Sequence, residues 1–346
     1  MKPKSIILAS AAALLLLGIS VYSIYNMQIN KTHNSREYIS ITVNYEASYD
    51  EVNDYAEYGV SIYVYDLQSA EISEVFSFPQ NSMYALGVYD KKSNSVYYTK
   101  EKDNNTYERQ RTGDQIYKYN LDTGVDTMLT EDLLAINYII PVDGAVFFVA
   151  ARMNNRSLAL GKINLSDGTI EYWKESDTLS AQTISIDRIQ KRIYTAVYDS
   201  AERDIATDLF NSGASTHPVA YKHSIYSYNY NLDDKQEILS KDDMGIYSVY
   251  ARDNRLLYGA LDLTVFPDEA YDMSEVIDIN SKDVLFQSEE HFSRRGGGFS
   301  QDLKGVYSAV RTDDFAGIEY FDFETQERKT ITAIDFGYLG SIQLMY

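Results

Sequence analysis

The chain has 346 residues, of which 51 are acidic and 31 basic, so its formal net charge at pH 7 is −20. A field of this sign repels phosphate backbones and argues against nucleic acid as a partner. The absence of cysteine excludes thiol nucleophiles, iron–sulfur clusters, cysteine zinc sites and a lipid-modified cysteine anchor.

The N-terminal residues form a separate element. Lys2 and Lys4 precede an uncharged stretch, residues 5–25, that is long enough to cross a bilayer as a helix with its start inside. We therefore predict a cytoplasmic stub at 1–4, a transmembrane signal-anchor at 5–25 and a linker at 26–37.

The alternative for this segment is a signal peptide cleaved near Ser23, which would make the protein secreted. In either case the remainder is expected on the extracytoplasmic side of the cell membrane. An exported chain without disulfides is typical of a bacterial surface protein.

From residue 38 to residue 346 the sequence repeats a two-part pattern. The first part is a turn aspartate followed by an apolar and then an aromatic residue, and it occurs at Asp90, Asp143, Asp187, Asp253 and Asp302. The second part ends an alternating strand with an acid or amide and an apolar residue, and it occurs at Asp66-Leu67, Asn120-Leu121, Asn164-Leu165, Asn231-Leu232, Asp278-Ile279 and Asp322-Phe323. A period of about 40–50 residues with short strands and no helical segments is typical of a β-propeller.

Each propeller blade has four antiparallel strands, named A to D from the central channel outwards. The expected strands of blades 2 and 3 are 83–89, 95–99, 115–121, 125–130, 135–142, 145–150, 158–165 and 169–173, and the A strands of blades 4, 5 and 6 begin near Ala181, Gly245 and Gly298. The first repeat starts at a B strand, 38–45, whereas the last segment, 338–346, is a strand with no B strand after it. We predict an all-β, six-bladed propeller over 38–346, closed by the C-terminal strand joining the first blade, because closure removes exposed sheet edges.

One segment carries a resemblance to a known family. Residues 299–309, which begin Phe299-Ser300-Gln301-Asp302-Leu303-Lys304, resemble the phenylalanine-serine-proline-aspartate-glycine-lysine run of TolB-like six-bladed propellers, whose repeats are WD40-like or PD40-type. Gln301 stands where proline is usual and Leu303 where glycine is usual. The resemblance implies this fold and a habit of binding proteins or small molecules, with no single activity.

The connections between B and C strands are long in four blades, at 47–58, 102–114, 199–222 and 263–273. Long loops on one face of a rigid scaffold are where binding residues accumulate, although insertions also lengthen surface loops at little cost in stability. The first two loops supply Tyr55, Tyr58, Arg109 and Arg111 as binding candidates, with the tyrosines as anchors and the arginines as carboxylate partners.

The first of these loops is also rich in oxygen ligands. Asp50, Glu51, Asp54 and Glu57 could hold Ca²⁺, but the spacing of a calcium loop is absent. No cofactor is therefore expected, and a solvated acidic loop is the alternative interpretation.

The D–A connection into blade 6 combines three glycines with His291, Arg294 and Arg295. Paired arginines are rare positive charge in this acidic chain and could hold a carboxylate or phosphate of a ligand. The alternative is that they neutralise neighbouring acids.

These observations favour a non-catalytic propeller that binds a protein or peptide through the face carrying the B–C and D–A connections. Two alternatives stay open: a metal-dependent hydrolase or lyase acting on a small sugar or ester in the central channel, and a small-molecule or glycan binder without chemistry. The hydrolase would place carboxylates and amides on A strands at the channel mouth, where Asn137 is the candidate.

Overall fold

The structure is a computed structural model that describes residues 37–346 except 51–54, 81, 83, 103–112, 154, 176–177, 216–218, 265–271 and 313–314. The predicted signal-anchor at 5–25 lies outside the described residues. No helix within the described part is long and apolar enough to cross a membrane.

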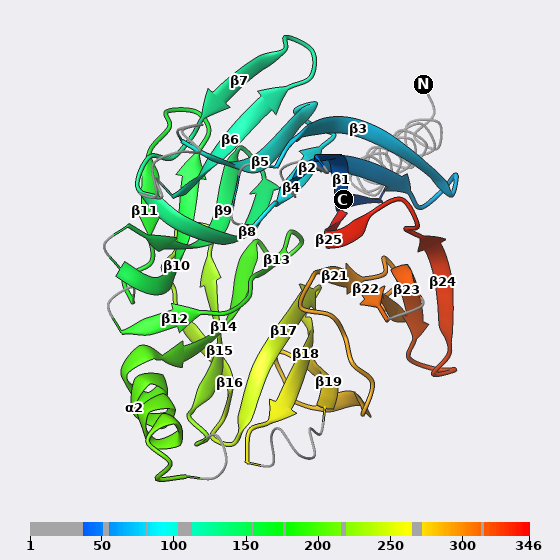
Figure 1. Ribbon diagram of the computed structural model, residues 1–346. Coiled ribbons are helices and arrows are strands. Elements are labelled where there is room, and N and C mark those ends of the chain that lie inside the picture. The colour runs from blue at the N-terminus through cyan, green and yellow to red at the C-terminus, as the bar shows by residue number, and fades with distance from the viewer. Residues whose placement is uncertain are drawn as a thin grey trace, which may run out of the picture.

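The described residues form six antiparallel sheets that follow one another around a central axis (Figure 1). From inside outwards, blade 1 contains β25 (Tyr338–Met345), β1 (Tyr38–Asp50), β2 (Tyr55–Asp66) and β3 (Glu71–Pro79), and blade 2 contains β4 (Gly87–Asp90), β5 (Ser95–Glu101), β6 (Asp114–Asn120) and β7 (Val125–Met128). Blade 3 contains β8 (Leu133–Val142), β9 (Ala145–Arg152), β10 (Asn155–Asn164) and β11 (Ile170–Tyr172), and blade 4 contains β12 (Leu179–Ala181) and β13 (Ser185–Asp187) in one inner position, then β14 (Arg192–Asp199), β15 (His223–Asn229) and β16 (Gln236–Lys241). Blade 5 contains β17 (Met244–Arg252), β18 (Arg255–Asp262), β19 (Asp272–Asp278) and β20 (Val284–Ser288), and blade 6 contains β21 (Gly297–Phe299), β22 (Gly305–Arg311), β23 (Ala316–Asp322) and β24 (Arg328–Ala333).

The predicted closure of the ring is confirmed. Strand β25 pairs antiparallel with β1, with Ser40 opposite Gln343 and Ile41 opposite Ile342. Figure 1 shows the red C-terminal strand beside the blue first strand. The last strand of the chain is thus the innermost strand of the first blade.

The two-part sequence pattern has a hydrogen-bonding basis. In blades 1, 2, 5 and 6 the acid or amide that ends the C strand accepts backbone N–H groups of the following turn, as Asp322 Oδ1 does from Glu324 and Thr325. In blades 2, 3, 5 and 6 the next, apolar residue donates its N–H to the A–B turn of the same blade, as Leu121 does to Asn94. In these four blades the apolar residue therefore ties the two turns of the blade together.

Blade 4 departs from the predicted pattern. Strand β15 ends at Asn229, and Asn229 Oδ1 accepts the N–H of Asn231 and of Asp233. The turn role assigned to Asn231 therefore belongs to Asn229, because the turn here is longer and the apolar Leu232 comes three residues after Asn229.

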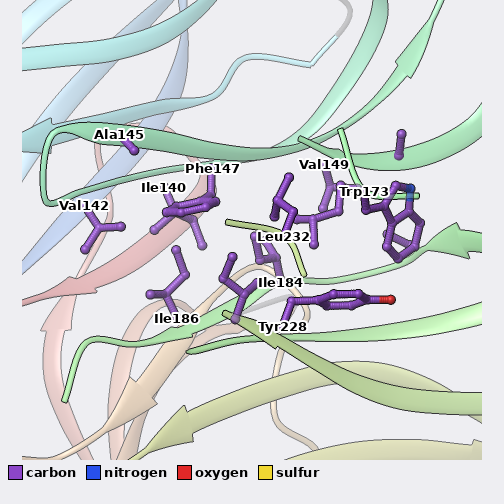
Figure 2. Packing of buried hydrophobic residues seen from close by; sticks show 14 of the residues in the cluster. Ile140, Val142, Ala145, Phe147, Val149, Trp173, Ile184, Ile186, Tyr228 and Leu232 are labelled. Atoms are coloured by element: carbon purple, nitrogen blue, oxygen red, sulfur yellow. The ribbon is translucent and has the colours of Figure 1, made fainter. Parts of the chain in front are cut away.

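The core lies between neighbouring blades. Figure 2 shows the wedge between blades 3 and 4, where Phe147 and Val149 of β9 meet Ile184, Ile186 and the Trp173–Tyr228 pair. Those two rings are in edge-to-face contact with centroids 5.9 Å apart. Burying each such large side chain stabilises the fold by about 1.5–3 kcal/mol, so the blade-to-blade wedges carry much of the stability.

The expectation of no helical segment is wrong at one place. Helix α2 (Ser200–Asn211) fills the B–C connection of blade 4, and the Asp199 carboxylate caps it by accepting from the N–H groups of Ala201 and Glu202. Ala206 is the one buried residue of this helix. Ile205, Leu209 and Phe210 have helical spacing in the sequence, but they are exposed, so the helix does not bury an apolar stripe against the protein.

Candidate functional site

The strand directions give the propeller two different faces. The face formed by the B–C and D–A connections, here the loop face, carries helix α2. The opposite face, here the turn face, is formed by the short A–B and C–D turns. The innermost strand of each blade runs from the loop face to the turn face, so these strands line an axial channel with one end at each face.

A cavity of about 500 Å³ occupies this channel and is bordered by the innermost strands of all six blades. Its described lining contains four arginines, Arg188, Arg252, Arg294 and Arg295, and no aspartate or glutamate. The channel therefore has the opposite sign of charge to the chain as a whole. Low-dielectric walls strengthen the field of these charges.

At the turn end of the channel an arginine is neutralised. Arg252, the last residue of β17, lies 2.6 Å from a carboxylate oxygen of Glu37, and the two side chains are 7% and 11% exposed. The Arg252 guanidinium also donates to the carbonyl of Phe299 at 3.1 Å and lies 4.2 Å from the ring centre of Tyr346.

Arg188 lies beside the same tyrosine, 5.5 Å from its ring centre, and donates to the carbonyl of Pro141 at 3.0 Å. The C-terminal residue therefore lies against both arginines at this end. At the turn end, both arginines are thus held by other groups of the protein, namely a carboxylate, carbonyl oxygens and the Tyr346 ring.

At the loop end Arg295 fastens two blades together. Its guanidinium donates to the hydroxyl of Tyr338 at 2.7 Å and to the carbonyls of Leu339 and Gly340, both at 3.4 Å. The neighbouring Gly296 has φ +111°, and a Cβ there would lie 1.8 Å from the carbonyl oxygen of Ile342. Only glycine permits this close approach of blade 6 to β25.

Arg294 differs from Arg295 in what its side chain contacts. It is exposed, borders the channel, and its guanidinium has no hydrogen bond or ion pair with any described residue. Its backbone is held, because the hydroxyl of Tyr138 on the opposite blade donates to the Arg294 carbonyl at 3.2 Å. A fixed backbone thus presents, at the loop end, a guanidinium that no described residue pairs with.

The tyrosines at this end are neutral hydroxyls. Burial raises the pKa of Tyr138, although the nearby Arg294 charge opposes the increase, and burial also raises the pKa of Tyr250. Tyr250 donates to the carbonyls of Ser293 and Gly296, which fixes the segment that carries the arginines. His291 stacks on Tyr247 with ring centroids 5.0 Å apart, and its Nδ1 lies 3.0 Å from that hydroxyl.

The sequence-predicted site residues fall into three groups. His291, Arg294 and Arg295 share one connection on the loop face, and Tyr58 lies in β2 with 50% of its surface exposed. Arg109, Arg111 and the side chain of Tyr55 lie outside the described part of the chain.

Sequence reasoning missed Arg188 and Arg252. Each is adjacent to a turn aspartate of the repeat, Asp187 or Asp253, and so ends at the channel when the turn forms. That adjacency is a signal from which both could have been found.

Among the described residues, no three His, Asp or Glu side chains come close enough to hold a metal ion. Besides hydroxyl side chains, the described lining contains three carboxamides, Asn137 on β8, Gln182 between β12 and β13, and Gln343 on β25. These side chains can donate and accept hydrogen bonds in a channel whose described lining contains arginines but no aspartate or glutamate.

No protein-family model matches the chain, and no curated protein matches it in sequence. Several solved structures match it in fold. TolB from Acinetobacter baumannii is 13% identical with a TM-score of 0.56, over 89% of this chain and 66% of that chain. A nidogen–laminin complex is 10% identical with a TM-score of 0.56, over 90% of this chain and 98% of the other.

The propeller domain of the trilobed protease from Pyrococcus furiosus, described as having an open velcro topology, is 11% identical with a TM-score of 0.54, over 88% of this chain and 84% of that domain. The present chain differs in having a closed ring. It spans slightly under two thirds of the matched TolB chain. At these identities the likeness shows the fold, and it confirms the resemblance to TolB-like propellers.

Proposed function

We propose that this protein is a non-catalytic, membrane-anchored, extracytoplasmic propeller that binds a protein partner through its loop face. The observation that carries the proposal is the exposed apolar surface of helix α2. Ile205, Leu209 and Phe210 are 62%, 41% and 42% exposed. Ile205 and Leu209 are one helical turn apart and form a ridge on the face that also carries the channel mouth.

The residues around this ridge indicate what kind of surface the partner presents. Glu202, Asp204 and Asp208 surround the apolar residues, and Arg203 is tied to Asp204 at 2.5 Å. An apolar centre with an acidic rim is complementary to an apolar patch flanked by basic side chains. The partner is therefore expected to present such a patch.

The position of Glu37, the first described residue, supports an arrangement in which the loop face points away from the membrane. Glu37 pairs with Arg252 at the turn end of the channel, so the predicted linker at 26–37 leaves from the turn face. A linker of this length spans at most about 40 Å when fully extended. With residues 5–25 in a membrane, the turn face would be near the bilayer and helix α2 would point away from it.

The similar structures are compatible with this use of the fold. One of them is a complex of two proteins, nidogen and laminin. The identities are low, so the argument for binding rests on the exposed helix and the loop face of this chain.

The test is cross-linking and affinity recovery of the tagged full-length protein from its native membrane, with partners identified by mass spectrometry. The double variant Ile205→Asp and Leu209→Asp should lose the partner, because both side chains are exposed and the change removes the apolar contact without entering the core. Ile189→Asp, at an equally exposed apolar residue on the turn face (52%), is the matched control and should retain it. Equal recovery by wild type and the helix variant would contradict the proposal.

A further inference from the structure

The charge of the channel is the starting observation. In a chain of net charge −20, the described channel lining holds four arginines and no acid. Glu37 neutralises Arg252 alone among them. Arg188, Arg294 and Arg295 have no carboxylate within ion-pair distance among the described residues, so the channel is positive inside an acidic protein.

The two ends of the channel differ in the polar groups that remain available to a ligand. The turn end is occupied by Tyr346 and by the Glu37–Arg252 pair. At the loop end, the Arg294 guanidinium is accessible and all five of its N–H donors are unused by described residues. A planar guanidinium in this state matches a carboxylate in a bidentate arrangement.

The remaining polar lining matches a peptide. The side-chain amides of Asn137, Gln182 and Gln343 come from three different blades, and none has a hydrogen bond to a described residue. Each can pair with a peptide group, because a carboxamide offers both a donor and an acceptor. The cavity of about 500 Å³ lies within the range of sites for ligands larger than an inorganic anion.

We propose that the loop end of the channel binds the free C-terminal carboxylate of a peptide segment, with Arg294 as the carboxylate ligand and the three carboxamides as partners of the peptide backbone. This inference rests on the proposed function, since it assigns one part of a protein partner to the channel. It adds a second contact that is chemically distinct from the apolar ridge of α2.

The experiment uses the purified full-length protein and a library of N-acetylated tetrapeptides, prepared both with a free C-terminal carboxylate and as the C-terminal amide. Bound peptides are identified by native mass spectrometry, and the affinity of the selected peptide is then measured by calorimetry. We expect binding from the free-acid library and at least about tenfold weaker binding of the amidated peptide, the loss typical of removing one charged hydrogen-bonding partner.

Three variants locate the site. Arg294→Gln should weaken binding of the free-acid peptide at least about tenfold, and Arg294→Lys should restore part of the loss because it returns the charge without the fork. Lys329→Gln removes the same charge from an exposed position on the outer strand β24 and should bind as wild type does. Equal binding of acid and amide, or no effect of Arg294→Gln, would overturn the inference.

Inorganic phosphate serves as the competitor. If phosphate displaces the peptide at concentrations near the dissociation constant of the peptide, the site binds anions in general. That result would also overturn the assignment to a peptide.

Failure here is distinguishable from failure of the proposed function. Partner recovery that survives Arg294→Gln but is lost with the α2 variant would refute the channel inference and leave the loop-face proposal intact.

Discussion

The two ends of the channel use the same residue type in opposite ways. At the turn end, Arg252 is buried against Glu37 and Tyr346. At the loop end, Arg294 is exposed, and its backbone rather than its side chain is held, through Tyr138. The difference teaches that arginines lining one channel can be structural, as Arg252 is, or available to a ligand, as Arg294 is in the described part of the chain. The predictions below test that contrast.

The largest effect is expected from removing the strand that forms one wall of both ends. Deleting residues 338–346 removes β25, whose Leu339, Ile342, Leu344 and Met345 are all buried. Each such side chain contributes about 1.5–3 kcal/mol, so the loss is comparable to the whole stability of a typical domain, about 5–15 kcal/mol. Size-exclusion chromatography and circular dichroism should show no folded monomer, whereas deletion of residue 346 alone should leave the ring closed. A cooperative, monomeric transition in the longer deletion would contradict this.

The second effect separates the two ends directly. Arg252→Met should lower the free energy of unfolding by about 3–5 kcal/mol, because it leaves the Glu37 carboxylate buried without its partner. Urea unfolding monitored by fluorescence gives the value. Adding Glu37→Gln to Arg252→Met should recover part of the loss, and a single variant as stable as wild type would show that the pair does not matter.

A smaller, pH-dependent effect is expected at His223, the first residue of β15. His223 is 1% exposed, its Nδ1 accepts the N–H of Ile246 at 3.3 Å, and burial lowers its pKa from 6.5 to about 4. Below pH 6.5 the unfolded chain therefore binds a proton at this histidine that the folded chain does not bind. The contribution of His223 to the free energy of unfolding is complete above pH 6.5 and decreases as the pH falls towards 4. The whole contribution is about 3 kcal/mol.

The variant His223→Asn keeps a hydrogen-bond acceptor but removes this titration. Urea unfolding at a series of pH values between 7 and 4.5 should show a shallower decline for the variant than for wild type. Parallel curves would mean that His223 does not contribute to the acid sensitivity.

The smallest effect on stability is expected at the loop end. Arg294→Gln should change the free energy of unfolding by no more than about 0.5 kcal/mol, since the side chain is exposed and has no described partner. The same urea experiment measures it. A loss as large as that of Arg252→Met would mean that both ends are structural and that the contrast between them is wrong.

The fold was predictable because most blades repeat the same turn chemistry. The aspartates and amides that the repeat places at strand ends are the residues that accept backbone N–H groups in the turns. The unequal number of B-strand and C-strand signals also identified the closing strand. Helix α2 was not predicted: Ile205 and Leu209 stand at helical spacing, but both are exposed and Ala206 alone is buried.

The site was predictable only in part. The sequence singles out Arg294 and Arg295 together as rare positive charges, but it cannot show that Arg295 donates to β25 while Arg294 does not. That distinction depends on the arrival of the C-terminal strand beside blade 6. Arg188 and Arg252 come from two further blades and share the channel only after the ring closes.

The pairing of β25 with β1 also has a consequence for how the protein folds. Strand β1 is the first strand of the propeller and its inner partner β25 is the last, so the contact joins strands about 300 residues apart in the sequence. Contacts of such high sequence separation form slowly, and an unpaired strand edge is prone to aggregation while it waits. Ring closure is therefore expected to be the slow step of folding, and blade 1 keeps an unpaired strand edge until β25 is in place.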